Sequence, residues 1–463
     1  MDKILLHNGT IVTSEKECIG SVVIEGERIA KVLYSDAEDY ERKVAGLIFS
    51  NPEMKIMDAH GLHLMAGGID AHVHFREPGL THKADMETES RAAAAGGVTS
   101  VIDMPNTQPA TTSGQALKEK IGLTVGRSAV NIGFHWGATN SNAEEISEAL
   151  QGRSSEVKSE MIGGVKVFMG SSTGNMLVDE NHTLDRLFSI KERPVLVHCE
   201  DEATIKANLA AAIEKYGDEI PFEEHENIRS RTACIKSSIK ALEMAIRNNT
   251  RLVLCHISTK EEVEMARAAK LNNPGIIAET SCNYLWFSNE DYKTSGSRVK
   301  CNPSIKKASD REALRLALAE GIIDTIGSDH APHLPSEKDA PYCKAPSGLP
   351  SIQQSLPVLV TIAAEAEIPL TRIASAFSEK AAETYGLDRG ILKEGYAADI
   401  VVFNKDQEFI VRNEDQYGKC GWTPYDGKKL KGKIDTVFVN GHIAVEGGKV
   451  KEDVFYGRPL EFK

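Results

Sequence analysis

Gly68-Ile69-Asp70-Ala71-His72-Val73-His74-Phe75 is a short, mainly apolar run with two histidines one residue apart at its end. Successive side chains of a strand point to opposite faces, so His72 and His74 project the same way and can share one metal ion. An isolated pair of this kind is more often a pair of packed or exposed histidines than a metal site. The rest of the chain has to decide between these interpretations.

Seven further runs of β-branched and apolar residues follow, separated by Ala- and Glu-rich stretches of helical length. They are Val98 to Met104, Val130 to Trp136, Gly164 to Met169, Pro194 to His198, Leu252 to His256, Ile276 to Ser281 and Ile323 to Asp329. Met86 to Ala95 illustrates the helical stretches, because it is rich in good helix formers and is followed by Gly96-Gly97 as a stop. This alternation predicts an α/β fold in which eight parallel strands close a (β/α)₈ TIM barrel.

The two ends of the chain differ from this alternating middle. Ser21 to Ile29 and Thr436 to Val445 are both β-rich, and Asn440-Gly441 in the second is a hairpin signal. We expect the ends to pair in a small composite β-sandwich domain of residues 1–60 and 390–463. Residues 61–389 would then form the catalytic barrel, and a length of 463 residues suits one large domain with a smaller one.

Composition excludes several classes of protein. The chain is 41% hydrophobic, no stretch approaches the roughly 20 apolar residues of a membrane span, and its start lacks the pattern of a signal peptide. A net charge of −13 argues against nucleic-acid binding. The eight cysteines are scattered without a Cys-x-x-Cys pair, which indicates reduced thiols and, with the chain start, a cytoplasmic protein. Base rates favour a homodimer.

Side chains that can bind metal stand at the ends of the predicted strands. In such a barrel the chemistry lies at the carboxyl ends of the strands, and the segments concerned are otherwise largely apolar or small. The residues are His72, His74, Lys166, His198, His256 and Asp329, at the ends of runs one, four, five, six and eight. Their placement predicts a two-metal hydrolase. Cys199 and Cys255 adjoin two of these histidines, and strand alternation predicts that both thiols point to the opposite face.

Four stretches give the chain a specific resemblance. They are His72-Val73-His74-Phe75-Arg76-Glu77-Pro78-Gly79, Met104-Pro105-Asn106-Thr107, Asn302-Pro303-Ser304-Ile305-Lys306 and Ser328-Asp329-His330-Ala331-Pro332-His333. On these residues the chain resembles the amidohydrolase superfamily, and within it the dihydroorotases, over essentially its full length. The third stretch departs from the Asn-Pro-Pro-Leu-Arg of many dihydroorotases, which weakens the case for Lys306 and leaves Asn302 a candidate for the substrate ring.

The resemblance implies a binuclear site. His72 and His74 would hold the more buried metal together with Asp329, and His198 and His256 would hold the second. Lys166 would be carbamylated, which turns it into a bridging carboxylate, although some bacterial relatives have aspartate at this place. Two zinc ions are expected from the mixture of imidazole and oxygen ligands, and other divalent metals could substitute.

The resemblance also implies a reaction, the reversible hydrolysis of L-dihydroorotate to N-carbamoyl-L-aspartate in de novo pyrimidine biosynthesis. A metal-bridged hydroxide would attack the ring carbonyl, with Asp329 as the general acid and base. Arg76, Asn106 and His333 would bind the substrate carboxylate, since the planar fork of arginine suits that group. Segments 170–175 and 334–348 are expected to cover the pocket as mobile flaps.

Two other interpretations stay open on the sequence. The chain could be another cyclic amidohydrolase, an allantoinase or a hydantoinase, although relatives such as allantoinase typically have Ser where this chain has Arg76. It could also be a noncatalytic partner of aspartate carbamoyltransferase, because barrels of this family can lose their metal ligands. The complete ligand set argues against that second interpretation.

Overall fold

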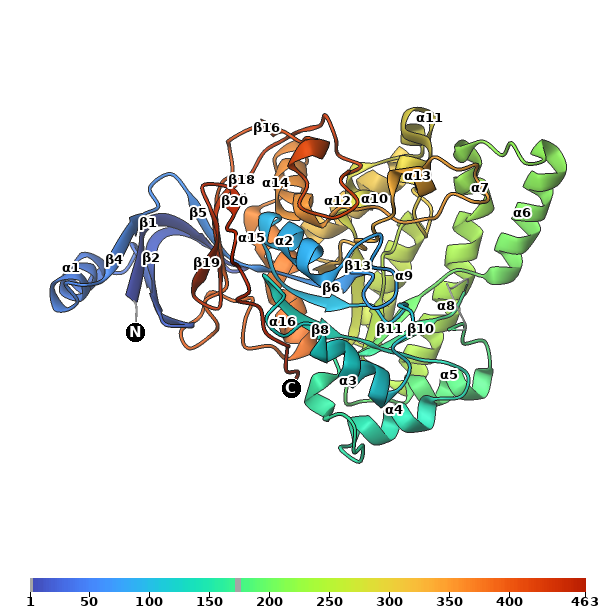
Figure 1. Ribbon diagram of the computed structural model, residues 1–463, viewed down its shortest axis with the longest axis horizontal. Coiled ribbons are helices and arrows are strands. Elements are labelled where there is room, and N and C mark those ends of the chain that lie inside the picture. Colours follow the sequence, from blue (N-terminus) through green and yellow to red (C-terminus); the bar gives the residue numbers. More distant parts are fainter. Residues whose placement is uncertain (1–2, 171–175) are drawn as a thin grey trace.

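The centre of the computed structural model is a ring of parallel strands, and the structure describes residues 3–170 and 176–463 (Figure 1). The strands are β6 (Gly68–Val73), β7 (Val98–Asp103), β8 (Asn131–Phe134), β9 (Trp136–Gly137), β10 (Val165–Phe168), β11 (Val195–His198), β12 (Leu252–Leu254), β13 (Ile276–Thr280) and β14 (Thr325–Ile326). β6, β7 and β8 form one sheet, and β9 to β14 form a second in chain order. A parallel bridge from Val73 to His330 closes the ring. The predicted TIM barrel is confirmed.

Each predicted run contains a strand, but most strands are shorter than their runs. The third run is divided into β8 and β9 at His135, whose Nε2 lies 2.9 Å from the carbonyl oxygen of Ala71. Burial lowers the pKa of His135 to about 3, so this ring is neutral and donates to that carbonyl. The last run pairs only over β14, because the chain then turns away to deliver Asp329 to the barrel mouth.

Helices separate the strands and cover the outside of the ring. The principal ones are α2 (Met86–Ala95), α3 (Gly114–Gly122), α4 (Ala143–Leu150), α5 (Asn181–Phe188), α6 (Glu202–Tyr216), α8 (Arg231–Asn248), α9 (Lys260–Lys270), α12 (Ala308–Glu320), α14 (Ser355–Glu365), α15 (Leu370–Ala374) and α16 (Lys380–Tyr385). α2 has the predicted bounds, begins at an Asp85 cap and is followed by Gly97 at φ 77°. Among the described residues, no helix is long and apolar enough to cross a membrane.

Two layers of apolar side chains hold the barrel together. Alternate residues of the strands, such as Val165, Val167, Val195 and Val197, pack outward against the helices in the main core cluster. Inward residues, such as Leu196 and Val253, pack in a second cluster inside the ring. The inner cluster fills the lower part of the barrel, so the polar side chains at the strand ends stand on a closed apolar base.

Strands from both ends of the chain share one nine-stranded sheet. Its members are β1 (Lys3–Val12), β2 (Glu17–Glu25), β3 (Arg28–Tyr34), β4 (Lys55–Asp58), β5 (His63–Ala66), β15 (Ile400–Asn404), β18 (Lys433–Val439), β19 (His442–Glu446) and β20 (Lys449–Val450). β15 joins the two ends, because it pairs antiparallel with β5 on one side and with β18 on the other. In Figure 1 this sheet lies beside the barrel, with α1 (Tyr40–Ser50) at its outer tip.

Candidate active site

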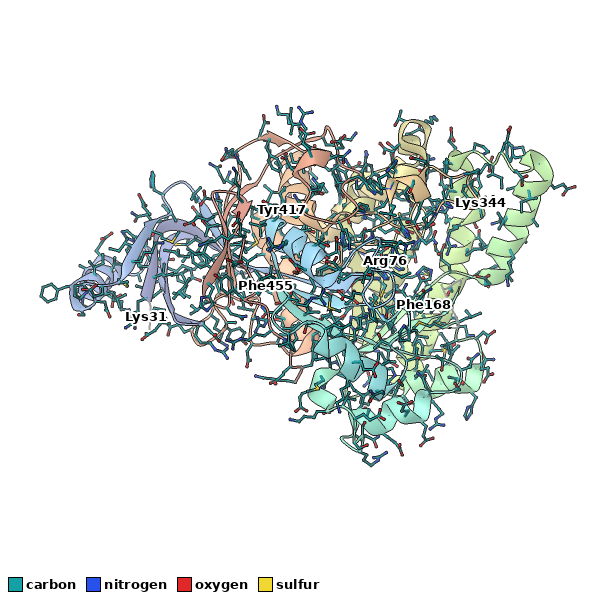
Figure 2. All side chains as sticks on the ribbon, in the orientation of Figure 1. Lys31, Arg76, Phe168, Lys344, Tyr417 and Phe455 are labelled. Atoms are coloured by element: carbon teal, nitrogen blue, oxygen red, sulfur yellow. The ribbon has the colours of Figure 1, made fainter. Side chains whose placement is uncertain are left out.

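All of the site residues predicted from the sequence line one cavity of about 230 Å³ at the carboxyl ends of the strands. The lining residues are His72, His74, Arg76, Asn106, Lys166, Phe168, His198, His256, Asn302, Asp329, Ala331, His333, Pro346, Ser347 and Gly348. Arg76 and Phe168, two of these residues, are labelled in the barrel part of the molecule in Figure 2. A larger hollow of about 520 Å³, between Gln353, the 409–417 segment and Lys433, has no histidine or cysteine in its lining.

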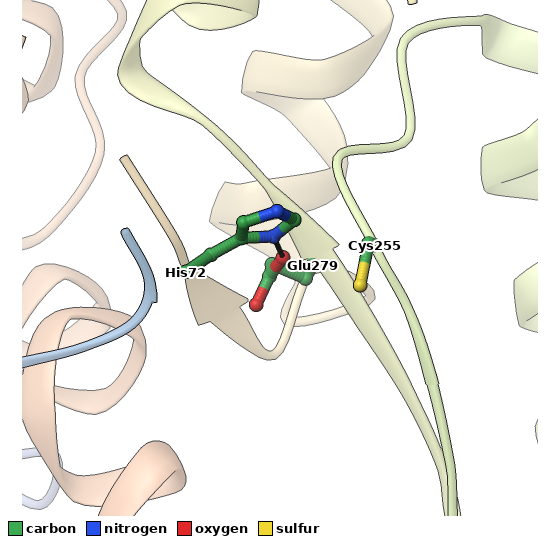
Figure 3. A group of neighbouring side chains, drawn as sticks. All are labelled: His72, Cys255 and Glu279. Carbon is green, nitrogen blue, oxygen red and sulfur yellow. Dashed lines mark hydrogen bonds and ion pairs between the residues drawn. The ribbon is translucent and has the colours of Figure 1, made fainter. Parts of the chain in front are cut away.

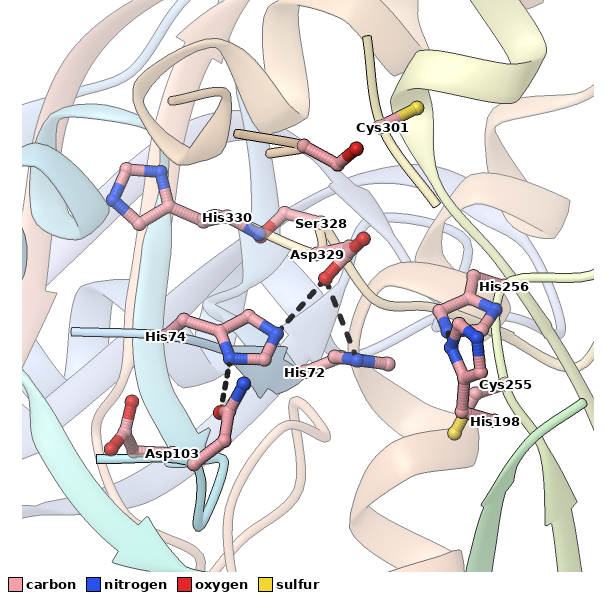
Figure 4. A network of polar contacts seen from close by, with 12 residues as sticks. His72, His74, Asp103, His198, Cys255, His256, Cys301, Ser328, Asp329 and His330 are labelled. Atoms are coloured by element: carbon pink, nitrogen blue, oxygen red, sulfur yellow. Dashed lines mark hydrogen bonds and ion pairs between the residues drawn. The ribbon is translucent and has the colours of Figure 1, made fainter. Parts of the chain in front are cut away.

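Three ligand-type side chains converge on one point of this cavity. Oδ1 of Asp329 lies 3.1 Å from Nε2 of His74 and 3.6 Å from Nε2 of His72 (Figure 4). These three side chains offer ligand atoms that all lie within 4.8 Å of one another. Two imidazole nitrogens and a carboxylate oxygen at this separation are a donor set that fits a divalent metal such as zinc.

A second pair of histidines stands on the other side of the cavity. Nδ1 of His198 lies 3.0 Å from Nε2 of His256, and both rings are buried. The other nitrogen of His198 contacts Oε2 of Glu200 at 2.9 Å, while Nδ1 of His256 has no hydrogen-bond partner within residues 3–170 and 176–463. With Nε2 of His198 donating to Glu200, its Nδ1 carries a lone pair, which can accept a hydrogen bond from Nε2–H of a neutral His256 or bind a cation. Two imidazole nitrogens at this separation are also donors that fit a shared metal ion.

Lys166 reaches the cavity from β10 between these two groups. Its side chain is 1% exposed, and Nζ donates to Sγ of Cys255 at 3.3 Å. No carboxylate of the described residues is within ion-pair distance of this ammonium. A buried charge without a counter-ion is costly, so this position is unfavourable for a free ammonium group.

The position of Cys255 corrects the prediction from strand alternation. The side chains of Cys255 and His256 both point into the barrel. Regular alternation does not hold here, because β12 ends at Leu254 and His256 has a φ of 37°. The thiol of Cys255 lies with His72 and Glu279 in a buried group below the cavity (Figure 3). Burial raises the pKa of Cys255 to about 12, so the thiol is neutral. Cys199 packs in the outer core, as predicted.

Two more site residues have positive φ angles, which side chains other than glycine rarely adopt. Arg76 has a φ of 66° and Asp329 a φ of 48°. In β6, the register against β7 shifts between Asp70 and Val73, which is a β-bulge just before His74. Strain of this kind at a cavity is typical of functional sites, because it aims side chains that regular strand geometry would direct elsewhere.

Arg76 and His333 form a second subsite beside the histidines. Nη2 of Arg76 lies 3.0 Å from Nε2 of His333, and Nε donates to the carbonyl of Pro332 at 3.1 Å. Arg76 is 8% exposed and has no carboxylate partner among the described residues. Burial, followed by the charges of Arg76 and Lys83, lowers the pKa of His333 strongly, so its ring is neutral. Asn302 adds a buried side-chain oxygen that has no hydrogen-bond partner in the part of the chain that the structure describes.

Asn106 lies at the boundary between the two subsites. Its Oδ1 is 2.7 Å from Nδ1 of His74, so it holds the ring whose other nitrogen faces Asp329. The sequence predicted Asn106 as a carboxylate contact, and the contact with His74 was not predicted. Such a hydrogen bond orients the imidazole ring, as it does for histidines that bind metal through their other nitrogen.

Asp329 is an ionised carboxylate in this setting. Burial raises its pKa, but the hydrogen bond with His74 and the neighbouring rings of His72 and His256 outweigh it, and the net effect is a strongly lowered pKa. His330, the next residue, points away and lies 2.7 Å from Glu89, where it supports the barrel wall.

Sequence reasoning missed two buried glutamates that hold the histidines. Oε1 of Glu279 is 2.7 Å from Nδ1 of His72, and Glu200 binds His198 together with the guanidinium of Arg229. Both had a signal in the sequence. Glu279 interrupts an apolar run, and Glu200 follows His198 at the same spacing as His74 follows His72. The predicted flap at 170–175 falls almost wholly outside the described residues.

Comparison with known proteins places this cavity in context. The profile described as the amidohydrolase family matches residues 63–444. The dihydroorotase of Methanosarcina acetivorans is 32% identical over 450 residues, covering 95% of this chain and 90% of that protein. The dihydroorotase of Clostridioides difficile is 28% identical over 449 residues, covering 95% and 99%.

Solved structures agree on the fold. The L-hydantoinase of Arthrobacter aurescens superposes with a TM-score of 0.89 at 24% identity and covers 100% of both chains. The dihydropyrimidinase of Brevibacillus agri gives a TM-score of 0.85 at 24% identity and covers 98% of each chain. At such identities the similarity concerns the fold, and the cavity's own residues have to decide the substrate.

Proposed function

The chain belongs to the amidohydrolase family, a family of metal-dependent hydrolases, and from this premise we propose that it acts as a dihydroorotase. The reaction would be the reversible hydrolysis of L-dihydroorotate to N-carbamoyl-L-aspartate in pyrimidine synthesis. The relatives with this printed name cover most of the chain and support the proposal.

The observation that carries the choice of substrate is the buried guanidinium of Arg76. It lines the cavity, has no carboxylate partner among the described residues and lies against the neutral ring of His333. A buried cation without a counter-ion is costly, and a planar guanidinium pairs best with a carboxylate. Dihydroorotate has a carboxylate on its ring, whereas hydantoin, dihydrouracil and allantoin do not. A substrate carboxylate would complete this subsite.

We propose that His72, His74 and Asp329 hold one zinc ion and that His198 and His256 hold a second. When bound, such a pair of ions supplies a Lewis acid for the ring carbonyl and lowers the pKa of a water molecule. A carbamate on Lys166 would bridge the two groups, and the absence of a carboxylate beside this ammonium among the described residues supports it. Glu279, Glu200 and Asn106 would orient three of the histidines.

Asp329 would move the proton in both directions. Its ionised carboxylate accepts a proton from the attacking water as the new carbon–oxygen bond forms. It then gives this proton to the ring nitrogen as the carbon–nitrogen bond breaks, so that one water is consumed and the ring opens. Arg76 and His333 would hold the substrate carboxylate, and the unpaired oxygen of Asn302 can accept a hydrogen bond from a ring N–H.

The test is a comparison of substrates with the purified, metal-loaded protein. We expect turnover of L-dihydroorotate and N-carbamoyl-L-aspartate to exceed that of hydantoin, dihydrouracil and allantoin. Preference for one of the neutral cyclic amides would move the protein to the hydantoinase or allantoinase type. Bound metal with no turnover of any of them would favour a noncatalytic partner of aspartate carbamoyltransferase.

Three further proposals concern the molecule as a whole. The first is the division into a β-sandwich domain of residues 1–60 and 390–463 and a barrel of residues 61–389, with β5 (His63–Ala66) as the one strand of the second range that pairs in the sheet of the first. The second is a homodimer, which sedimentation of the purified protein would test. The third is a cytoplasmic location, which remains a prediction from the sequence.

A further inference from the structure

Lys338 is a fully buried lysine whose ammonium binds only backbone carbonyls among the described residues. It ends α13 (Pro335–Lys338) and is 0% exposed. Nζ donates to the carbonyl oxygens of Lys300 at 3.1 Å, Pro346 at 2.8 Å and Gly348 at 3.1 Å. These three bonds use every N–H of an ammonium group, and a neutral amine would have one too few. The arrangement therefore requires the charged form of Lys338.

Lys300 repeats this arrangement on the same segment. It is 7% exposed, and its Nζ donates to the carbonyl oxygens of Tyr342 at 2.7 Å and Ala345 at 2.6 Å. Its own carbonyl accepts from Lys338 and from the backbone N–H of Gly348 at 2.9 Å. Neither lysine has a carboxylate partner among the described residues. Two buried ammonium groups thus hold four carbonyls of the 342–348 segment.

The same segment forms one wall of the active-site cavity. Pro346, Ser347 and Gly348 line it, and the carbonyl of Ser347 lies 3.1 Å from Nε2 of His333. Gly348 has a φ of 141°, and a Cβ there would lie 2.5 Å from the carbonyl oxygen of Ala331. The backbone of this wall packs closely against Ala331, and its position depends on the hydrogen bonds that it accepts from Lys338 and Lys300.

We propose that Lys338 and Lys300 are positioning residues that hold the 345–348 backbone against the substrate, an inference that rests on the proposed function of this cavity. Both ammonium groups bind backbone carbonyl groups, and neither lysine side chain lines the cavity. Loss of the hydrogen bonds of either lysine would let the 345–348 backbone move away from His333 and would weaken substrate binding. The chemical step at Asp329 lies on a different element and would change less.

The protonation of Lys338 gives this role a pH dependence. Burial lowers the pKa of Lys338 to about 7 and that of Lys300 to about 8. The titratable and charged groups that face Lys338 are Cys301, Lys300, Arg298, Arg76 and His333, and those that face Lys300 are Arg229 and Cys343. The three carbonyl acceptors of Lys338 need three N–H donors, which only its charged form has. All three hydrogen bonds are therefore present below a pH of about 7, and they weaken as pH rises through the pKa of Lys338. The KM for dihydroorotate is expected to rise over that interval.

The experiment compares Lys338→Met, Lys338→Arg and Lys300→Met with Lys344→Met, all in the full-length, metal-loaded protein. Lys344 is the matched control, because it is an exposed lysine of the same segment (Figure 2). Each variant is first checked for folding and metal content. The readouts are kcat and KM for dihydroorotate against pH, and the rate of amide hydrogen exchange in residues 342–349.

We expect Lys338→Met to raise KM by about tenfold or more, because the hydrogen bonds of a charged group are lost. The change in kcat should be smaller. Faster exchange in residues 342–349 should accompany it. Lys338→Arg should keep a low KM at high pH, because a guanidinium stays charged there. If Lys338→Met does not fold, Lys300→Met provides the same test.

Two outcomes separate the possible failures. The positioning role would be overturned if a folded, metal-bound Lys338→Met or Lys300→Met protein had the same amide exchange rates and KM as Lys344→Met. A wild-type protein that does not turn over dihydroorotate would overturn the proposed function instead. In that case, the exchange comparison alone still decides whether the two lysines hold the wall.

Discussion

Glu279 lies 2.7 Å from Nδ1 of His72, and both side chains are almost completely buried, at 1% and 2% exposure. With Nδ1–H donating to this carboxylate, the lone pair of His72 is left on Nε2, which faces Asp329. The two residues are 207 positions apart in the chain. The hydrogen bond thus fixes the ring and its tautomer from β13, which is separated from β6 in the ring only by β14.

Glu279→Gln should lower metal affinity by about 10- to 100-fold, because the residue that orients a ligand histidine is changed. The measurement is metal content after dialysis against a graded series of chelator concentrations. The matched control is Glu89→Gln, since Glu89 forms a similar buried pair with His330 at 2.7 Å, away from the cavity. Equal metal retention in both variants would contradict the role of Glu279.

Lys166→Ala should lose bound metal and activity, and added short carboxylic acids should restore part of both. The reason is that a small carboxylate can occupy the place of the proposed carbamate. Metal content and dihydroorotate turnover are measured with and without acetate or propionate. Lys120→Ala is the control, because Lys120 is also buried but pairs with Asp103 at 2.6 Å. Absence of rescue with full metal content would argue against a bridging carbamate.

Arg76→Ser should reduce kcat/KM for dihydroorotate by about 10- to 100-fold through loss of a charge-assisted hydrogen bond. Turnover of neutral cyclic amides such as hydantoin should fall less or increase. Arg76→Lys should be intermediate, because it keeps the charge but loses the planar fork. A uniform loss for charged and neutral substrates would show that Arg76 does not recognise the carboxylate.

Glu200→Gln should destabilise the protein by about 3 kcal/mol, because Arg229 would remain charged and buried without its partner. Burial raises the pKa of Glu200, but Arg229 and His198 outweigh it and lower the pKa well below its ordinary value of 4.5. Its contribution is therefore fully present above that value and is lost as pH falls below it.

The free energy of unfolding, measured by urea denaturation between neutral and acid pH, checks this prediction. The difference between wild type and Glu200→Gln should shrink as the solution becomes more acidic. Glu144→Gln serves as the control, because Glu144 forms an exposed ion pair with Arg186 that contributes little. A constant difference at all pH values would mean that the ionisation of Glu200 does not matter.

Much of the site could be predicted because barrel chemistry follows from strand order. His198 and His256 end runs of apolar residues, and parallel strands bring such ends to one mouth. Glu279 escaped prediction because it lies inside a run rather than at its end. Lys338 and Lys300 escaped because their partners are backbone carbonyls, which every residue has and no sequence pattern marks.

The local pattern of residues is enough to predict the alternation of strands and helices. With it comes the order in which the residues at the mouth of the barrel follow one another, namely His72, His74, Lys166, His198, His256 and Asp329. The periodicity of apolar residues is a local property, so it is visible along the chain. Which atoms come into contact depends on the folded barrel: Glu279 with His72, Cys255 with Lys166, and Lys338 with the backbone at 346–348. These contacts depend on how a closed ring sets distant strands side by side and on backbone angles such as the positive φ of His256, neither of which local pattern specifies.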